Sequence, residues 1–333
     1  MIIVRTPTRV SFCGGGSDLP VFYKKHAGAV ISAGLNRYIY LSIHPYFYPD
    51  RLICKYSQNE PVNNPSELKH PIFRVLLEQF GINGVEITST ADVPAGTGLG
   101  SSSSFTVGLL HALYAYTGKY VSAAFLAAEA CQTEIEVLKE PIGKQDQYAA
   151  AFGGLNMYRF NRDGSVVVEP VLLSPEASGR LEQNLLMFYT GDQRSASRIL
   201  SEQGKNVASD NEKERAQLEI CKLTDELFRE LNNDNIDALG DILNANWEYK
   251  RKLANGITNP LIDKAYCDAM SAGAAGGKLL GAGGGGFLLF YVPRHRQNAV
   301  KNALAELTYM DFGFSGSGSV VIYVGDKPKR SLA

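Results

Sequence analysis

The residues with the clearest chemical potential form one run of glycines and hydroxyls at residues 94–104, which reads Pro-Ala-Gly-Thr-Gly-Leu-Gly and then four serines. Glycine lacks a Cβ, so the backbone of such a loop can approach a ligand closely. A helix that begins at the serines adds unpaired N–H groups and a partial positive charge. The run therefore predicts a cradle for an anion of polyphosphate size, with Ser101 and Ser102 able to reach a phosphate oxygen or Mg²⁺.

Two common phosphate sites do not fit this run. A P-loop needs a lysine and a hydroxyl directly after its last glycine, and no lysine follows Gly98 or Gly100. The glycine spacing also differs from the dinucleotide-binding fingerprint. A flexible linker is the remaining alternative, but residues 85–91 alternate like a strand and residues 105–116 repeat like an amphipathic helix. These flanks favour a strand, a binding loop and a helix.

Three polar side chains elsewhere are candidates for chemistry. Asp18 follows three consecutive glycines and Ser17, and a carboxylate in such a turn suits vicinal sugar hydroxyls. Arg9 lies just upstream and offers a cation with five donors, although a surface ion pair is an equal alternative. Asp146 opens a short helix over residues 147–152, where an aspartate is most often a cap. The same position would keep it ionised, as a general base requires.

A second glycine cluster occupies residues 276–286 and leads into a very apolar strand at 287–291. Both flanks have core-like composition, so the cluster is not a low-complexity linker. Dense glycine between a helix and a buried strand indicates tight backbone packing. The first glycine run is the candidate for its neighbour.

The chain has 333 residues, 45% hydrophobic and 20% charged, which is enough for two globular domains. A hairpin pattern at 155–170 suggests a boundary there, giving domains 1–170 and 171–333. We expect strands at 1–5, 29–44, 52–56, 185–190 and 319–324, and helices at 71–80, 122–138, 211–231, 236–253, 261–273 and 295–307.

Composition also narrows the partners and the compartment. A net charge of −1 argues against nucleic acid or an anionic membrane as a general partner. No signal-peptide pattern or run of roughly 18 apolar residues occurs, so we expect no membrane contact. The five cysteines are scattered and form no Cys-x-x-Cys pair, which predicts a cytoplasmic protein with free thiols. The histidines show no metal-ligand spacing.

In this order, the segments resemble the GHMP small-molecule kinases, which include galactokinase, homoserine kinase and mevalonate kinase. Three stretches carry the resemblance, at 7–18, 94–103 and 278–287, and it covers essentially the whole chain. Residues 5–20 and 143–148, together with Tyr189, Thr190, Gly191 and Arg194, look like the D-glycero-D-manno-heptose 7-phosphate kinases. L-Fucokinases share part of this pattern.

The resemblance implies an α+β fold, with an N-terminal α/β domain and a C-terminal ferredoxin-like domain around one active site. It implies ATP and Mg²⁺ as co-substrates and a small sugar phosphate as acceptor. The product would be heptose 1,7-bisphosphate, a precursor of nucleotide-activated heptose for bacterial surface polysaccharides. A kinase of a neutral sugar such as L-fucose, or a non-catalytic sensor of ATP and sugar, are the alternatives. A homodimer is compatible with the resemblance.

Residue roles follow from the same resemblance. Asp146 would take the hydroxyl proton, and Arg9 would lie near the transferring phosphoryl group. Glu134 would be the acidic Mg²⁺ ligand, with the Ser102 hydroxyl beside it. Asp18 would accept from sugar hydroxyls within a turn formed with Gly15, Gly16 and Ser17. The ATP phosphate loop would comprise Pro94, Gly96, Thr97, Gly98, Leu99, Gly100, Ser101, Ser102, Ser103 and Ser104.

A phosphorylated sugar needs cations that a neutral sugar does not. Lys144 is the leading candidate because it lies two residues from Asp146, and pairing with Glu140 or Asp146 is its alternative role. Arg194 and Arg198 are the next candidates. Asp192 in the same turn weakens the case for an anion site there. No motif marks the adenine contacts, and residues 56–63 are the candidate region.

Overall fold

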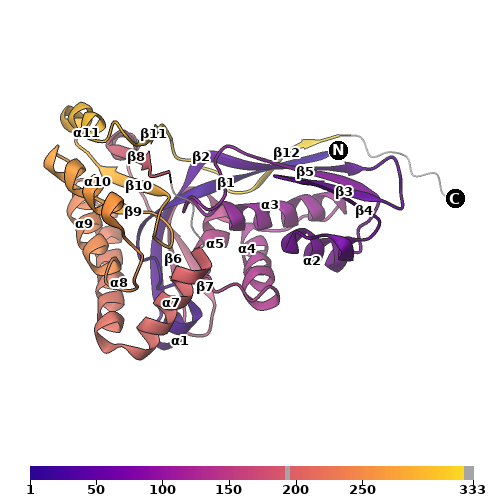
Figure 1. Cartoon of the computed structure of the whole chain (residues 1–333), viewed down its shortest axis with the longest axis horizontal. Helices are drawn as coiled ribbons and strands as arrows, with labels where there is room; N and C mark the ends of the chain where they lie inside the picture. The colour runs from indigo at the N-terminus through magenta and orange to yellow at the C-terminus, as the bar shows by residue number, and fades with distance from the viewer. Residues whose placement is uncertain (192–195, 326–333) are drawn as a thin grey trace.

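The computed structural model describes residues 1–191 and 196–325 and contains two β-sheets with helices packed against them (Figure 1). The larger sheet has eight strands in the order β12-β1-β2-β5-β3-β4, and a hairpin of β6 and β7 extends from β2. Only β3 and β5 pair in parallel among the described strands. The strands are β1 Ile2–Cys13, β2 Gly28–Pro45, β3 Leu52–Lys55, β4 Asn59–Val62, β5 Val85–Ala91, β6 Leu155–Phe160, β7 Val166–Pro170 and β12 Val320–Val324.

The smaller sheet has the strand order β11-β8-β10-β9, and all its pairs are antiparallel. Numbered along the chain this order is fourth, first, third, second, which is the expected ferredoxin-like arrangement. The strands are β8 Leu185–Tyr189, β9 Gly276–Leu279, β10 Phe287–Tyr291 and β11 Thr308–Met310. The helices of this half are α6 Pro175–Gln183, α7 Ala196–Ser209, α8 Asn211–Asn232, α9 Ala238–Lys250, α10 Pro260–Ser271 and α11 Gln297–Ala303.

Four helices of the first half, α2 to α5, lie on one face of the larger sheet, and Figure 1 shows α2, α3 and α4 side by side, whereas α1 lies next to α7. Their apolar sides bury the strands' alternating residues, among them Leu41 and Ile87, both with no exposed surface. The helices are α1 Pro20–His26, α2 Pro71–Phe80, α3 Ser101–Tyr116, α4 Ala123–Cys131 and α5 Gln145–Phe152. None of the described helices is both long and apolar enough to span a bilayer.

Strand β1 connects the two halves. Val4, near its start, packs in the core under α3, whereas Val10 and Phe12, near its end, pack with Met187 and Leu289 of the smaller sheet. The two halves therefore share a continuous apolar interface along β1 and β2. A side chain on the middle of β1, such as Arg9, lies where the two halves meet. The boundary at residue 170 stays a prediction, and it coincides with the end of β7.

Two local expectations were wrong. The helix expected over 122–138 ends at Cys131 and continues as a π-helical turn, η2 (Gln132–Val137). Asp146 does not cap its helix, because α5 already begins at Gln145 and Asp146 lies in the first turn. Helices α1, α6 and α7 and strands β4, β9 and β11 are additional to those expected. The Ser122 cap was right, since its Oγ accepts from the Phe125 amide at 3.2 Å.

Candidate functional site

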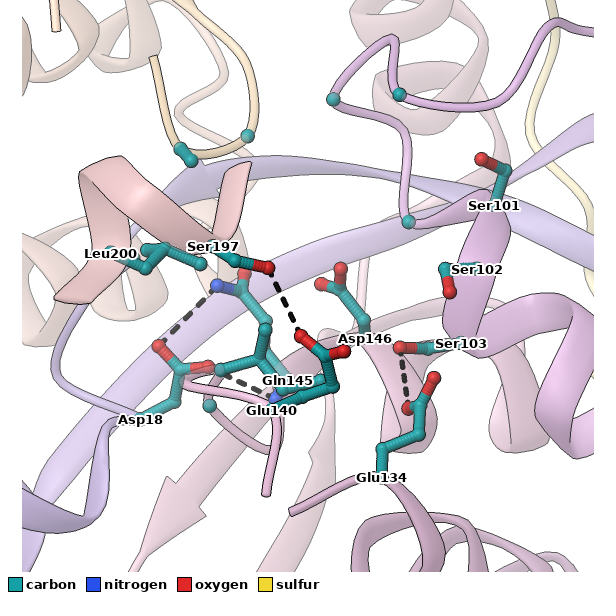
Figure 2. Close-up of a pocket in the computed structure, with 18 of the residues that line it drawn as sticks. Asp18, Ser101, Ser102, Ser103, Glu134, Glu140, Gln145, Asp146, Ser197 and Leu200 are labelled. Atoms are coloured by element: carbon teal, nitrogen blue, oxygen red, sulfur yellow. Dashed lines mark hydrogen bonds between the residues drawn. The ribbon is translucent and has the colours of Figure 1, made fainter. Parts of the chain in front are cut away.

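A cavity of about 400 Å³ lies between the two halves of the molecule. We call residues 94–100 the first glycine loop and residues 281–286 the second glycine loop, and both loops line the cavity together with the start of α3. Figure 2 shows the serines of α3 on one side and Asp18, Gln145 and Glu140 on the other. Of the residues predicted for the site, the cavity is lined by Arg9, Gly15, Gly16, Asp18, Gly96, Gly98, Gly100, Ser101, Ser102, Ser103, Glu134 and Asp146.

Asp146 and Arg9 form an ion pair at the centre of this cavity. The Arg9 Nε donates to Asp146 Oδ1 at 2.8 Å and Nη2 donates to Oδ2 at 3.0 Å, a two-pronged contact that fixes the carboxylate plane. Nη1 donates to the carbonyl oxygen of Gly98 at 2.6 Å, so the pair is tied to the first glycine loop. A Cβ on Gly100 would lie 3.2 Å from Asp146 Oδ2. The carboxylate and the glycine loop thus share one site.

Glu134 is held by the π-helical turn and is 2% exposed. Its carboxylate accepts from Ser103 Oγ at 2.8 Å, Thr106 Oγ1 at 2.9 Å and Gln147 Nε2 at 2.5 Å. Burial raises its pKa to about 7, against the lowering effect of these three donors. A carboxylate has about four acceptor positions, so one remains beyond these three donors, and Glu134 lines the cavity. Turns of this π type occur frequently at functional sites.

Glu134 therefore fits one part of the predicted Mg²⁺ site. Ser102, the predicted hydroxyl ligand, is exposed and lines the cavity, while its neighbour Ser103 makes the hydrogen bond to Glu134. The Glu134 carboxylate and the Ser102 hydroxyl are hard oxygen donors of the kind that Mg²⁺ prefers. In the described part of the chain no group of three or more His, Cys, Asp or Glu side chains is placed to hold a metal ion. A cation here would complete its shell with phosphate oxygens and water.

The two glycine loops pack backbone against backbone. A Cβ on Gly98 would lie 2.8 Å from the Leu280 carbonyl oxygen, and one on Gly281 would lie 2.6 Å from the Gly98 Cα. Gly98 also has a φ of +85°, which few other residues adopt. The expected contact between the two glycine clusters is therefore present. Because both loops line the cavity, this contact forms part of its wall.

Asp18 is buried at the opposite end of the cavity. Its Oδ1 accepts from the Gly16 amide at 3.0 Å, and its Oδ2 accepts from the Gln145 amide at 3.1 Å, as Figure 2 shows for Gln145. Burial raises its pKa, with the Asp146 charge adding to that effect. Gly143 makes this arrangement possible, because a Cβ there would lie 1.9 Å from Oδ2.

Several predicted residues do not face the cavity. The Lys144 Nζ donates to the Gly164 carbonyl at 2.5 Å and lies over the Tyr23 ring, so its predicted phosphate contact has no support in this geometry and stays a prediction. Ser17 bonds to the backbone of Ala29. Four other predicted residues stabilise the loop instead. Thr97 Oγ1 donates to the Pro94 carbonyl, Ser104 Oγ donates to the Pro7 carbonyl, and Leu99 is fully buried. Arg194 lies outside the described residues.

Comparison with known proteins identifies the family to which the chain belongs. The model for the GHMP kinases N terminal domain matches residues 68–154, and the model for the GHMP kinases C terminal domain matches residues 227–310. A D-glycero-alpha-D-manno-heptose 7-phosphate kinase of Campylobacter jejuni is 30% identical over 95% of this chain and 97% of its own length. The chain is a GHMP kinase.

Two further relatives of this GHMP kinase differ in how much of their own length the chain covers. A bifunctional fucokinase/GDP-fucose pyrophosphorylase of Arabidopsis thaliana is 27% identical over 86% of the chain, which spans 29% of that longer protein. The crystal structure of a D-glycero-D-manno-heptose 1-phosphate kinase from Bacteroides thetaiotaomicron has a TM-score of 0.80 and 24% identity, with 98% and 100% of the two chains covered. That structure supports the fold. Family membership makes the chain an ATP-dependent phosphotransferase.

The cavity of the kinase also contains residues that the sequence did not single out. Ser197 of α7 donates to Glu140 at 3.0 Å and so links α7 to the loop before α5 (Figure 2). Gln145 could have been found from its place beside Asp146. Lys250 also lines the cavity, 5% exposed, at the end of α9. A lysine in the last turn of a helix is ordinary in sequence, so no local signal marked it.

Proposed function

We propose that this kinase transfers the γ-phosphoryl group of ATP to the anomeric hydroxyl of D-glycero-D-manno-heptose 7-phosphate and forms the 1,7-bisphosphate. The observation that carries the proposal is the Asp146–Arg9 pair in the same cavity as the first glycine loop and the start of α3. The acceptor follows from the Campylobacter jejuni relative, whose name states that sugar phosphate and 97% of whose length aligns. The product would be a precursor of nucleotide-activated heptose, which is used to make surface polysaccharides.

The phosphate side of the site would hold ATP. Backbone amides of the first glycine loop and the N-terminus of α3 would bind the β- and γ-phosphates. The Ser101 and Ser102 hydroxyls lie at that helix start and line the cavity. Mg²⁺, when bound by Glu134 and Ser102, would neutralise charge on the phosphates. His70, Pro71 and Ile72 line the cavity next to α3, whereas residues 56–63 do not line it, so the adenine contacts stay a prediction.

The acceptor side would position the sugar. Asp18, with Gly15 and Gly16 beside it, would accept from sugar hydroxyls, and Asp146 would accept the proton of the reacting hydroxyl. Phosphoryl transfer has a loose transition state, so alignment and charge neutralisation supply most of the rate. Arg9 would serve both needs, because it orients Asp146 and is bonded to the Gly98 carbonyl of the phosphate loop.

An assay of ADP release with three acceptors tests the proposal. The purified kinase would be given heptose 7-phosphate, unphosphorylated heptose and L-fucose at matched concentrations. We expect kcat/KM to be highest for heptose 7-phosphate, with phosphate appearing at the anomeric carbon by ³¹P NMR. Efficient turnover of L-fucose without turnover of heptose 7-phosphate would replace this acceptor with a neutral sugar, which the fucokinase relative makes the second candidate. Absence of ADP release with all three sugars would contradict the proposal and point to a different acceptor.

A further inference from the structure

Lys250 is a buried cation without a carboxylate partner. Its Nζ donates to the Gly281 carbonyl at 2.5 Å and to the Leu279 carbonyl at 3.3 Å, and no ion pair to it forms within the described residues. An ammonium has three N–H donors, so one remains beyond these two carbonyls. Lys250 is among the residues that line the cavity, so a bound ligand could supply the third acceptor. Fully buried lysines are rare unless they are paired.

The surroundings of Lys250 carry excess positive charge. Lys278, 1% exposed, and Arg9 both repel it, and Asp18 is the opposing charge nearby. Arg9 is already paired with Asp146, so it needs no further anion. Burial, followed by these two cations, lowers the pKa of Lys250 well below its usual value. An anion that entered this end of the cavity would relieve the cost of burying that charge.

We propose that Lys250 binds a phosphate oxygen of a bound substrate beside Gly281 of the second glycine loop. The inference deepens the proposed function and rests on it for the identity of the acceptor. Two phosphates could supply the oxygen: the terminal phosphate of the nucleotide, since Gly281 packs on Gly98, or the phosphate of the sugar, since Asp18 lies on the acceptor side. If the oxygen comes from the sugar's phosphate, Lys250 has the role first expected of Lys144, whose ammonium is bonded to Gly164.

The alternative is a structural clamp that only holds the carbonyls of Leu279 and Gly281. Two replacements separate the roles. K250Q keeps an N–H donor but loses the charge, and K250M loses both. Lys278→Met is the matched control, because Lys278 is equally buried and bonds a carbonyl, that of Phe12 at 3.1 Å, but does not line the cavity.

The experiment has a nucleotide arm and an acceptor arm. Calorimetric titration with ADP needs no acceptor, so it tests Lys250 even if heptose 7-phosphate proves not to be the substrate. KM is then measured for ATP, for heptose 7-phosphate and for unphosphorylated heptose. Loss of a charge-assisted hydrogen bond predicts that the dissociation constant or KM of the ligand that Lys250 binds rises about tenfold to a hundredfold, in both K250Q and K250M. A rise in the ADP dissociation constant or the KM for ATP identifies the nucleotide phosphate. A rise confined to the phosphorylated sugar identifies the acceptor.

The clamp predicts a different pattern. If K250Q leaves all these constants within twofold of wild type, and K250M lowers the melting temperature as K278M does, the proposal is wrong. Should neither Lys250 variant fold, amine-directed acylation of the wild type gives the answer by mass spectrometry. We then expect ADP or heptose 7-phosphate to protect Lys250 while Lys278 is unaffected. Equal labelling of Lys250 with and without both ligands would overturn the proposal.

Discussion

The two sides of the cavity are built in different ways. Most of the phosphate side is one continuous segment, in which β5, the first glycine loop and α3 follow one another from Val85 to Tyr116, and Glu134 joins it through its hydrogen bond to Ser103. The acceptor side combines segments far apart in the chain, with Asp18 held by Gln145, 127 positions later, and Lys250 held by the second glycine loop. A continuous site is specified by local sequence, whereas an assembled site depends on long-range packing.

Replacing Asp146 by Asn should have the largest effect, because this residue joins the two sides. We expect ADP binding to stay near wild type and kcat to fall at least a hundredfold, since the amide cannot take the hydroxyl proton. Single-turnover rates and ADP titration measure the two effects separately. Wild-type-like turnover would remove Asp146 from the mechanism, and loss of ADP binding would make it part of the phosphate side.

Glu134→Gln tests the phosphate side through stability. In metal-free protein the folded pKa of about 7 lies above the usual glutamate pKa of 4.5, so the folded state holds the proton more tightly. The stability contributed by this proton is full below about pH 4.5, falls as pH rises, and is lost above about pH 7. The fall should amount to about 3 kcal/mol.

Glutamine does not titrate, so E134Q should lack that fall. Urea unfolding from pH 4.5 to 8, with a chelator present, should show the variant gaining stability relative to wild type as pH rises. Parallel curves for the two proteins would mean that Glu134 is already ionised in the folded state.

Gly98→Ala tests how closely the two glycine loops must approach. Gly256→Ala is its control, because Gly256 has a similar φ of +79°, has no atom within 4 Å of an added Cβ and does not line the cavity. Both variants should lose about 1–2 kcal/mol from the unfavourable φ. Only G98A should also raise the KM for ATP, by about tenfold, because its methyl group must displace Leu280 and the loop with it. Equal KM values would show that nucleotide binding tolerates separation of the loops.

Gly143→Ala is the corresponding test on the acceptor side. Its Cβ would collide with Asp18 Oδ2, so the carboxylate must move. We expect the KM for the sugar to rise by about tenfold and the KM for ATP to change little. Steady-state kinetics with each substrate varied in turn measure both. An equal rise in both constants would show that the two sides are not independent.

These differences explain what the sequence could predict. Strand β5 and helix α2 match their expected bounds, and α3 begins at the predicted serines, because hydrophobic periodicity and glycines mark them locally. The π-helical turn at Glu134 has no such mark. From local sequence Asp146 resembles a helix cap, because its ion pair with Arg9, 137 positions away, forms only in the folded chain. The environment of Lys250 likewise exists only after α9 packs beneath the second glycine loop.

Lys144→Ala should have the smallest effect, and it decides between two cations for the acceptor side. In this structure the Lys144 ammonium contacts Gly164 and the Tyr23 ring, so its removal should cost about 1 kcal/mol of stability and change the KM for heptose 7-phosphate less than about threefold. K250Q, measured alongside, should have the larger effect on the acceptor if Lys250 binds the sugar's phosphate. A tenfold rise in KM in K144A, seen with the phosphorylated sugar and not with unphosphorylated heptose, would instead mean that Lys144 leaves Gly164 when the substrate binds. The acceptor side would then owe its specificity to a residue two positions from Asp146, as its place in the sequence first indicated.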